Sequence, residues 1–213
     1  MAAPSLVLAS GSPRRRELLG RFGVPFTVAP ADVDETVHPG EQAADLVRRL
    51  AVDKAQAGLA AVDASEVTVL AADTVVVVDG DVLGKPADDA DATAMLRRLS
   101  GRTHRVLTGV AVARRTTSAE PGRADRAVGP AVQLAVEVVA TEVDVVPLTE
   151  ADIAWYVATG EPHDKAGAYG IQGPFATFVI GIRGSHDNVV GLSLSVARRL
   201  LAQAGADPLA GST

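Results

Sequence analysis

The segment at residues 6–19, LVLASGSPRRRELL, constrains the fold of this chain more than any other. Its apolar run stops abruptly at Ser10, and a turn of small residues, Pro13 and a run of arginines follow. Ser12 is a favourable helix cap, and Pro13 suits the first turn of a helix because an N–H there has no partner to lose. The segment therefore predicts a β-strand, a tight turn and an α-helix.

The same turn has the composition of an anion-binding site. Backbone N–H groups at the positive end of a helix dipole attract phosphates, and the forked guanidinium donors of Arg14 and Arg15 match phosphate oxygens. A capped helix with a solvated basic face has the same residues. The segment taken alone does not separate these two interpretations.

Beyond this segment, short β-prone runs alternate with amphipathic stretches, which favours an α/β fold. We expect a single domain over residues 1–205, with a flexible insertion near 114–130 and a frayed tail at 206–213. The expected strands cover residues 6–9, 24–28, 67–72, 106–112, 132–146 and 175–182, with a hairpin at 75–83. The expected helices cover residues 41–58, 88–99, 149–160 and 192–204.

Composition excludes several classes of protein. Cysteine is absent, which rules out a disulfide framework and a thiolate metal site. The sequence has neither an apolar run long enough to span a membrane nor a secretory signal pattern, so a cytoplasmic protein is the simplest interpretation. The net charge of −6 argues against general nucleic-acid binding, which favours a basic surface, but it is compatible with a local anion site.

Three charged residues interrupt the local patterns. Asp73 lies between two aliphatic runs, where a carboxylate is costly to bury unpaired, so it is either a metal ligand or general base at a strand end or the cap of a bend. Lys54 continues the apolar stripe of its predicted helix and either snorkels to solvent or acts in a site. Lys85 is held between a glycine and a proline in an extended geometry, from which it could reach a phosphate.

The segment at residues 161–173 is a glycine-punctuated loop rich in hydrogen-bonding groups. Such a loop either closes over a ligand or only connects two elements. None of the histidines has the paired spacing of a zinc site, and His104 is expected to be a satisfied structural histidine rather than a catalyst. The serine-hydrolase elbow, the Walker loop and the Rossmann glycine turn are all absent from the sequence.

Residues 10–19 resemble the opening signature of the Maf family of nucleoside triphosphate pyrophosphatases. Other segments match in order across roughly residues 5–201, and this order is far more specific than any one motif. Ser193 stands where the family usually has proline, and residues 114–130 look like an insertion. The matching segments are DVDE at 32–35, ADTVV at 72–76, LGKP at 83–86, LSGRTH at 99–104, the loop at 160–173 and NVVGL at 188–192.

The resemblance implies hydrolysis of a nucleoside triphosphate between its α- and β-phosphates, which gives a nucleoside monophosphate and pyrophosphate. It also implies a mixed, twisted sheet flanked by helices, two lobes around a central cleft, and a homodimer. Asp73 is the implied proton acceptor, and Glu35 and Asp73 are the implied ligands of Mg²⁺ or Mn²⁺. The residues implied to hold the phosphates are Ser10, Ser12, Arg14, Arg15, Lys54 and Lys85.

Arg14, Thr74 and Gln172 match the branch of the family that resembles dTTP/UTP pyrophosphatases. The amide of Gln172 has both a donor and an acceptor, which suits the O4 and N3–H edge of thymine or uracil. Modified pyrimidine triphosphates are further candidate substrates, and their removal would clean the nucleotide pool. The alternative is a regulatory nucleotide-binding protein, because the family is also associated with arrest of septum formation in cell division.

Overall fold

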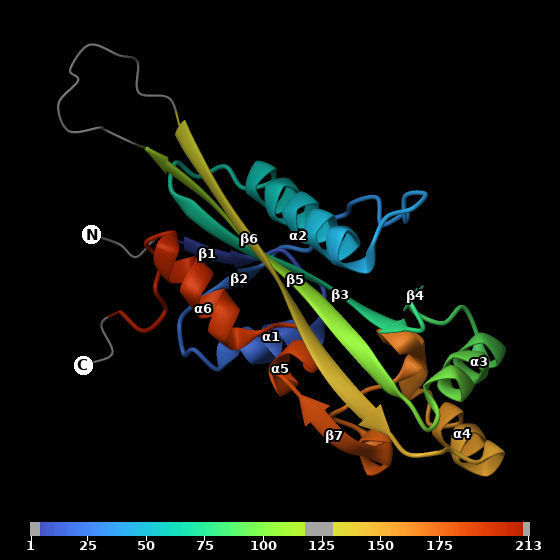
Figure 1. Cartoon of the computed structure of the whole chain (residues 1–213). Helices are drawn as coiled ribbons and strands as arrows, with labels where there is room; N and C mark the ends of the chain where they lie inside the picture. The colour runs from blue at the N-terminus through green and yellow to red at the C-terminus, as the bar shows by residue number, and fades with distance from the viewer. Residues whose placement is uncertain (1–4, 118–129, 211–213) are drawn as a thin grey trace.

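The computed structural model describes residues 5–117 and 130–210 (Figure 1). The strands are Ser5–Leu8 (β1), Thr27–Val28 (β2), Val67–Val78 (β3), Asp81–Leu83 (β4), Thr103–Thr117 (β5), Pro130–Val145 (β6) and Val179–Arg183 (β7). The α-helices are Pro13–Gly20 (α1), Ala43–Ala60 (α2), Asp89–Leu99 (α3), Glu150–Val157 (α4), His186–Val190 (α5) and Leu194–Gln203 (α6). Short 3₁₀ helices cover Glu161–Asp164 (η1), Ala166–Ala168 (η2) and Pro174–Phe178 (η3).

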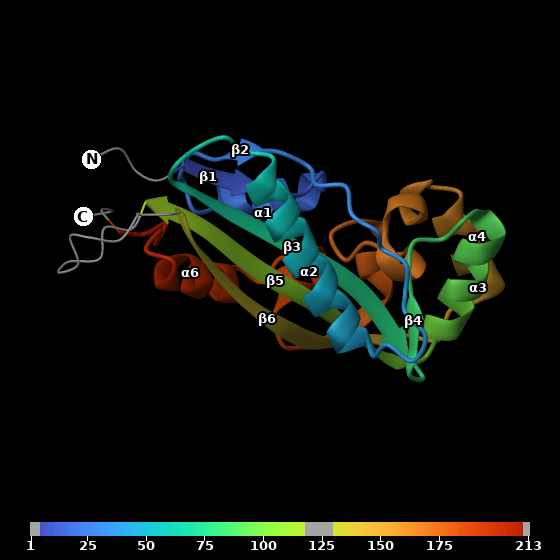
Figure 2. The same cartoon turned by 90° about the horizontal axis from the view of Figure 1, so that it is seen from above.

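The strands form a 7-stranded mixed sheet in the order β2-β1-β3-β5-β6-β7, with β4 paired to β3. β2, β1 and β3 are parallel, and the remaining pairs are antiparallel. Helix α2 covers one face of the sheet, and α1 and α6 cover the other (Figures 1 and 2). The predicted α/β fold with a mixed sheet flanked by helices is confirmed.

The turn between β1 and α1 forms as its sequence predicts. The Ser12 hydroxyl caps α1 by accepting a hydrogen bond from the Arg15 backbone N–H at 3.4 Å, and Pro13 occupies the first turn. Leu18 and Leu19 follow and bury their side chains in the main core. Local turn chemistry and the burial of these two leucines together fix the direction of α1.

Strand β1 is the point at which the chain changes direction across the sheet. The chain leaves β1 through α1 to reach β2 on one side, and it returns through α2 to reach β3 on the other side. In α/β sheets such a switch leaves a crevice beyond the carboxyl ends of the strands, where ligands bind. The crevice in this fold begins just after Leu8, at the β1–α1 turn.

Strand β3 carries side chains to both faces of the sheet beside this crevice. Val69 packs with the core under α2, whereas Leu70 packs with the core under α1 and α6, as the alternation of a strand requires. Farther along the strand, Asp73 contacts Lys54 of α2 and Thr74 contacts Arg15 of α1. One strand therefore supplies the two faces of the site with different polar groups.

Helix α2 approaches the sheet closely because β5 has a glycine beneath it. A Cβ atom on Gly109 would lie only 2.1 Å from the carbonyl oxygen of Val47. Any larger residue would therefore push α2 away from the sheet. Lys54 lies about two helical turns beyond Val47 on the same helix. The close approach of α2 to the sheet at Gly109 therefore also brings Lys54 close to β3.

Two lobes flank the crevice. One lobe contains β1, β2, α1 and α6, and the other contains α3, α4 and the 3₁₀ segments, as Figure 2 shows from above. The long strands β5 and β6 run through both lobes. The two-lobed architecture implied by the family resemblance is confirmed.

Several element boundaries differ from those predicted. Strand β3 does not end before Asp73 but continues to Val78, because the Asp73 carboxylate is paired with Lys54 and its burial is thereby offset. The expected strand over 24–28 shrinks to β2, since the backbone of Gly23 is left-handed and a proline follows at position 25.

The C-terminal region also differs from its prediction. The first part of the expected strand over 175–182 is the helix η3, because Phe175 turns inward and packs on Tyr156 and Tyr169. The expected helix over 192–204 is α6, and the short helix α5 precedes it unpredicted. The capping box predicted at Thr149 is present at the start of α4.

The predicted insertion at 114–130 overlaps the ends of β5 and β6, which remain paired as far as Thr117 and Pro130. Residues 118–129 lie outside the described residues, so the flexibility expected there stays a prediction, as does the single-domain assignment. The tail expected at 206–213 is ordered at its start, where the Ala206 N–H donates to the Leu201 carbonyl oxygen at 2.8 Å and Pro208 is buried. Across 5–117 and 130–210, the helices are all too short or too polar to cross a bilayer.

Candidate active site

A large cleft opens where one edge of β3 is left uncovered. Strand β1 pairs with β3 only as far as Leu70, and β4 pairs with it only from Val76 onward. The cleft has a volume of about 1300 Å³. Small-molecule pockets usually have volumes of ~300–1,000 Å³, so this cleft has room for a ligand of nucleotide size.

Every site residue predicted from the sequence lines this cleft. The residues come from the β1–α1 turn, the first turn of α1, the loop before α2, α2 itself, β3, the β4–α3 connection and the loop after η2. They are Ser10, Ser12, Arg14, Arg15, Glu35, Lys54, Asp73, Thr74, Lys85 and Gln172. The fold thus brings the predicted residues together, whereas the role of each residue stays a prediction.

Glu35, Lys54 and Asp73 form an ion triad on the α2 face of β3. The Lys54 ammonium nitrogen lies 2.6 Å from Asp73 Oδ1 and 2.6 Å from Glu35 Oε1. Lys54 and Asp73 are buried, whereas Glu35 is exposed on the loop before α2. The interpretation in which Lys54 snorkels to solvent is wrong, because its ammonium group turns inward to the two carboxylates.

The ion triad also determines the charge of Glu35. The hydrogen bond from Lys54 lowers the pKa of Glu35, burial opposes this shift, and the positive charges of Lys54, Lys85 and Arg15 add to the lowering. Glu35 is therefore a carboxylate at neutral pH, as a ligand for a cation must be.

The donor set of the ion triad fits a divalent cation that is shared with a substrate. The Glu35 and Asp73 side chains converge, and each engages the Lys54 ammonium nitrogen through one carboxylate oxygen. Mg²⁺ commonly binds through one or two carboxylates and completes its shell with water and substrate phosphates. The described residues contain no cluster of three or more histidine, aspartate or glutamate side chains that would hold such an ion without a substrate.

Arg15 is anchored on the opposite face of β3. Its guanidinium group donates hydrogen bonds to the Gly191 carbonyl oxygen at 2.8 Å, to Ser10 Oγ at 3.3 Å and to Thr74 Oγ1 at 3.0 Å. Burial lowers the pKa of Arg15, and the nearby Asp73 carboxylate opposes that shift. Because its hydrogen-bond partners are all neutral, Arg15 keeps its positive charge for an anion in the cleft.

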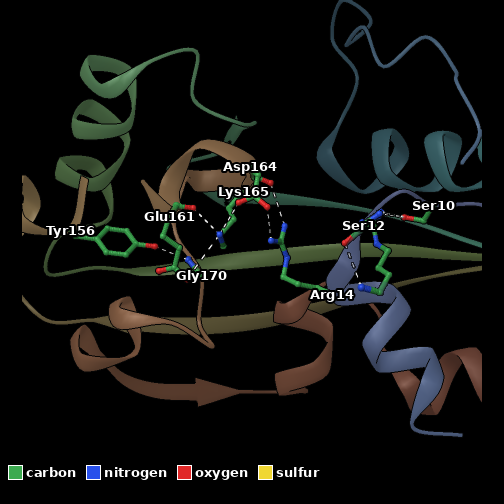
Figure 3. A network of polar contacts seen from close by, with 9 residues as sticks. Ser10, Ser12, Arg14, Tyr156, Glu161, Asp164, Lys165 and Gly170 are labelled. Carbon is green, nitrogen blue, oxygen red and sulfur yellow. Dashed lines mark hydrogen bonds and ion pairs between the residues drawn. The ribbon is translucent and has the colours of Figure 1, made fainter. Parts of the chain in front are cut away.

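Arg14 instead reaches across the cleft to the other lobe (Figure 3). Its Nη1 donates to Asp164 Oδ2 at 2.8 Å, and its Nη2 donates to the Asp164 carbonyl oxygen at 3.2 Å. The second carboxylate oxygen of Asp164 accepts a hydrogen bond from Lys165 Nζ at 2.7 Å. Burial alone would raise the pKa of Asp164, but the hydrogen bonds from Lys165 and Arg14 outweigh it and lower the pKa to about 2.

The loop at 160–173 forms the far wall of the cleft, and aromatic residues support it from behind. The Tyr156 hydroxyl accepts a hydrogen bond from the Gly170 N–H at 3.0 Å (Figure 3). The Tyr169 hydroxyl lies 2.7 Å from Nε2 of His104, which is buried, and His104 is the structural histidine that the sequence predicts. Gln172 is exposed on this supported loop, at the wall of the cleft.

Sequence reasoning missed three polar residues that build the site. Thr108 Oγ1 lies 3.0 Å from Thr74 Oγ1 and thereby supports the contact of Thr74 with Arg15. Its polarity within an otherwise apolar β-prone run was a usable signal. Asp164 and Lys165 lie in a loop that the sequence identifies as a candidate ligand cover, but nothing in the sequence says that they meet Arg14.

Comparison with known proteins decides the family. The family model described as "Maf-like protein" matches residues 5–204. This chain belongs to the Maf-like family. A protein of Anaeromyxobacter sp. named dTTP/UTP pyrophosphatase is 55% identical over 200 residues, which are 94% of this chain and 89% of that protein. Proteins of the same name from Symbiobacterium thermophilum and Shewanella oneidensis are 50% and 48% identical, over 94% of this chain and 94% and 98% of their own lengths.

Solved structures add little to this Maf-like assignment. A nucleoside-triphosphatase / dITP/XTP pyrophosphatase from Mycobacterium abscessus covers 94% of this chain and 97% of its own, at 15% identity and a TM-score of 0.39. A similarity of this size is too low to bear on the chemistry. The resemblance predicted from the motifs is confirmed by the family match, whose span of 5–204 includes every residue of the cleft discussed above.

Proposed function

We propose that this Maf-like protein hydrolyses nucleoside triphosphates at the α–β phosphoanhydride and releases a nucleoside monophosphate and pyrophosphate. The observation that carries the proposal is the convergence of the ion triad, Arg15 and the loop bearing Gln172 on one cleft. Relatives named dTTP/UTP pyrophosphatase, 48% to 55% identical over most of their lengths, support the same activity.

The two faces of β3 divide the work of this reaction. On one face, Arg15 binds the phosphate chain and stabilises the charge that develops in the transition state, assisted by Arg14 from α1 and Lys85 from the β4–α3 connection. On the other face, Asp73 accepts the proton of the attacking water. Lys54 holds the Asp73 carboxylate in place through its 2.6 Å hydrogen bond.

We also propose that Glu35 and Asp73 hold a divalent cation, Mg²⁺ or Mn²⁺, during the reaction. When bound, such an ion neutralises phosphate charge and lowers the pKa of its coordinated water. Lys54 contacts one oxygen of each carboxylate, Glu35 Oε1 and Asp73 Oδ1.

The proposed substrates are dTTP, UTP or modified pyrimidine triphosphates, which would make the enzyme a cleaner of the nucleotide pool. Gln172 is exposed on the cleft wall, where its amide matches the donor and acceptor pattern of thymine or uracil. The Thr74 hydroxyl is engaged by Arg15 at 3.0 Å. We therefore assign Thr74 to the positioning of Arg15, through which it would influence specificity.

A substrate panel tests the proposal. Purified protein with Mg²⁺ or Mn²⁺ is incubated with each candidate triphosphate, and the products are separated by ion-exchange chromatography. We expect pyrophosphate and the monophosphate from UTP and dTTP. Release of orthophosphate would contradict the proposed reaction, and a purine preference would overturn the specificity only.

The same panel distinguishes an enzyme from a regulatory nucleotide-binding protein, which would bind a triphosphate without turnover. We further propose, from the family resemblance, that the protein is a cytoplasmic homodimer. Light scattering after size-exclusion chromatography tests the dimer, since one chain has a mass of 21.8 kDa. A mass of one chain at micromolar concentration would refute the dimer.

A further inference from the structure

Arg14 is expected to hold phosphate, yet its guanidinium group is already bound to a carboxylate. Nη1 and Nη2 point to the side chain and the carbonyl oxygen of one residue, Asp164, at 2.8 and 3.2 Å (Figure 3). Carboxylates and phosphates engage the N–H groups of a guanidinium fork in the same way. A phosphate that binds the Nη1 and Nη2 groups of Arg14 therefore competes with Asp164 for these donors.

The neighbouring Arg15 shows that this arrangement is specific to Arg14. The hydrogen-bond partners of Arg15 are a carbonyl oxygen and two hydroxyl groups, which hold the side chain without neutralising its charge. Asp164, in contrast, brings a full negative charge to Arg14 from the opposite lobe. The two adjacent arginines therefore present themselves differently to an incoming anion.

We propose that Asp164 is an internal competitor for substrate phosphate at Arg14. It bridges the two lobes in this structure, and a polyphosphate displaces it when it binds. The inference rests on the proposed function, because that function supplies the phosphate-bearing ligand. It assigns a role to a residue that the chemistry of hydrolysis does not itself require.

Exposure allows this exchange to occur. The side chain of Asp164 is 60% exposed and that of Arg14 is 28% exposed, so both groups can be rehydrated when they separate. Ion pairs of this exposure shift an equilibrium by only about two- to fivefold, which a multiply charged ligand easily exceeds. The contact is therefore weak enough to yield and strong enough to measure.

A second cation, Lys165, keeps Asp164 paired after a ligand has displaced it from Arg14. Lys165 Nζ lies 2.7 Å from Asp164 Oδ1, and it also donates to the Glu161 carbonyl oxygen at 2.7 Å, which anchors it to the loop. Asp164 thus stays paired within its own lobe when Arg14 turns to a phosphate. The depressed pKa of Asp164, about 2, means that it stays charged throughout the neutral range and competes there at full strength.

Binding of inorganic tripolyphosphate tests the proposal without any need for turnover. Isothermal titration calorimetry at low salt should show about three- to fivefold tighter binding to Asp164→Asn than to the wild type. Asp164→Ser should show the same gain. Glu150→Gln is the matched control, because it removes the same charge from the same lobe at a residue that pairs with Arg97. Its affinity should equal that of the wild type.

A double-mutant cycle with Arg14→Gln locates the effect. Arg14→Gln alone should weaken tripolyphosphate binding, and Asp164→Asn should add no gain in that background. Unchanged tripolyphosphate binding in Asp164→Asn would overturn the proposal, because Asp164 would then not compete. Weaker binding would also overturn it, because Asp164 would then position Arg14 for the ligand. An equal gain in Glu150→Gln would also overturn it. Pyrophosphate release from UTP is measured separately, so failure of the proposed hydrolysis is distinguishable from failure of the competition.

Discussion

Two charged clusters line the cleft, and they differ in burial. In the ion triad, the side chains of Lys54 and Asp73 are 10% and 11% exposed. The pair of Arg14 and Asp164 is far more open to solvent. Breaking a buried pair leaves an uncompensated charge, whereas an exposed pair can exchange its partners for water at little cost. The buried pair of Lys54 and Asp73 is therefore a fixed part of the site, and the Arg14 contact is an exchangeable part.

The elements that carry the two clusters fit this difference. Lys54 and Asp73 project from a long helix and a central strand that are packed together, so their geometry is set by the core. Asp164 ends the short 3₁₀ helix η1 in the wall of the cleft. Groups that must be held during chemistry lie on rigid elements, while a group that moves with the ligand lies on a loop.

Replacement of Asp73 by asparagine should have the largest effect. The change keeps the shape of the side chain but removes the proton acceptor and one expected metal ligand, so kcat should fall by about 10²–10⁴-fold. Pyrophosphate release from UTP at saturating Mg²⁺ measures this loss. Activity within about threefold of the wild type would show that Asp73 does not accept the proton of the attacking water.

Replacement of Lys54 by methionine tests whether the triad is also a fixed part of the fold. Two carboxylates would then face each other without a cation, and we expect a loss of about 3 kcal/mol in the free energy of unfolding. Urea denaturation at pH 7 measures it. Adding Asp73→Asn in the same chain should recover most of the loss, because the buried charge is then gone. A loss below about 1 kcal/mol in the free energy of unfolding would show that Lys54 contributes no more to stability than an exposed ion pair does.

The support of the cleft wall should depend on pH through His104. Burial lowers the pKa of this histidine from 6.5 to about 4, so the unfolded chain binds a proton first as the pH falls. The contribution of His104 to stability should therefore be constant above about pH 6.5, fall progressively between pH 6.5 and 4, and lose about 3 kcal/mol in total. His104→Gln should flatten this part of the profile of unfolding free energy against pH. His186→Gln changes an exposed histidine and should leave the profile as it is.

The smallest effect is expected at Asp164. Asp164→Asn should change the free energy of unfolding by less than about 1 kcal/mol, because an exposed ion pair contributes little. The same variant should still raise the affinity for tripolyphosphate, so the effect on binding is expected without a matching effect on the free energy of unfolding. Thermal unfolding with and without tripolyphosphate measures both. A large loss of stability in the absence of ligand would make the Arg14 contact a structural bridge and remove the contrast between the two clusters.

Local sequence chemistry predicted much of this molecule. The Ser12 cap, the proline that follows it and the Thr149 capping box involve residues close together in the chain, and each formed as predicted. Where a distant partner decides the conformation, prediction failed. The continuation of β3 through Asp73 depends on Lys54 from another element, and the inward turn at Phe175 depends on two tyrosines of the cleft wall.

In the candidate site too, the residues could be predicted from the sequence, but the contacts between distant residues could not. All ten site residues that the sequence predicted line the cleft, but Asp164 and Lys165, which line it too, were not predicted. The motifs did not show that Lys54 would turn inward to two carboxylates, or that Arg14 would meet Asp164. Both contacts join segments that the sequence treats as independent.

The sequence by itself determined the family, the order of most strands and helices, and the set of polar residues available to the site. Tertiary structure alone decided which charges are buried together and which remain open to exchange. The physical reason is that the energy of a charge depends on its surroundings rather than on its neighbours in the chain. Arg14 and Asp164 are 150 positions apart, and only the folded arrangement of the two lobes makes them partners.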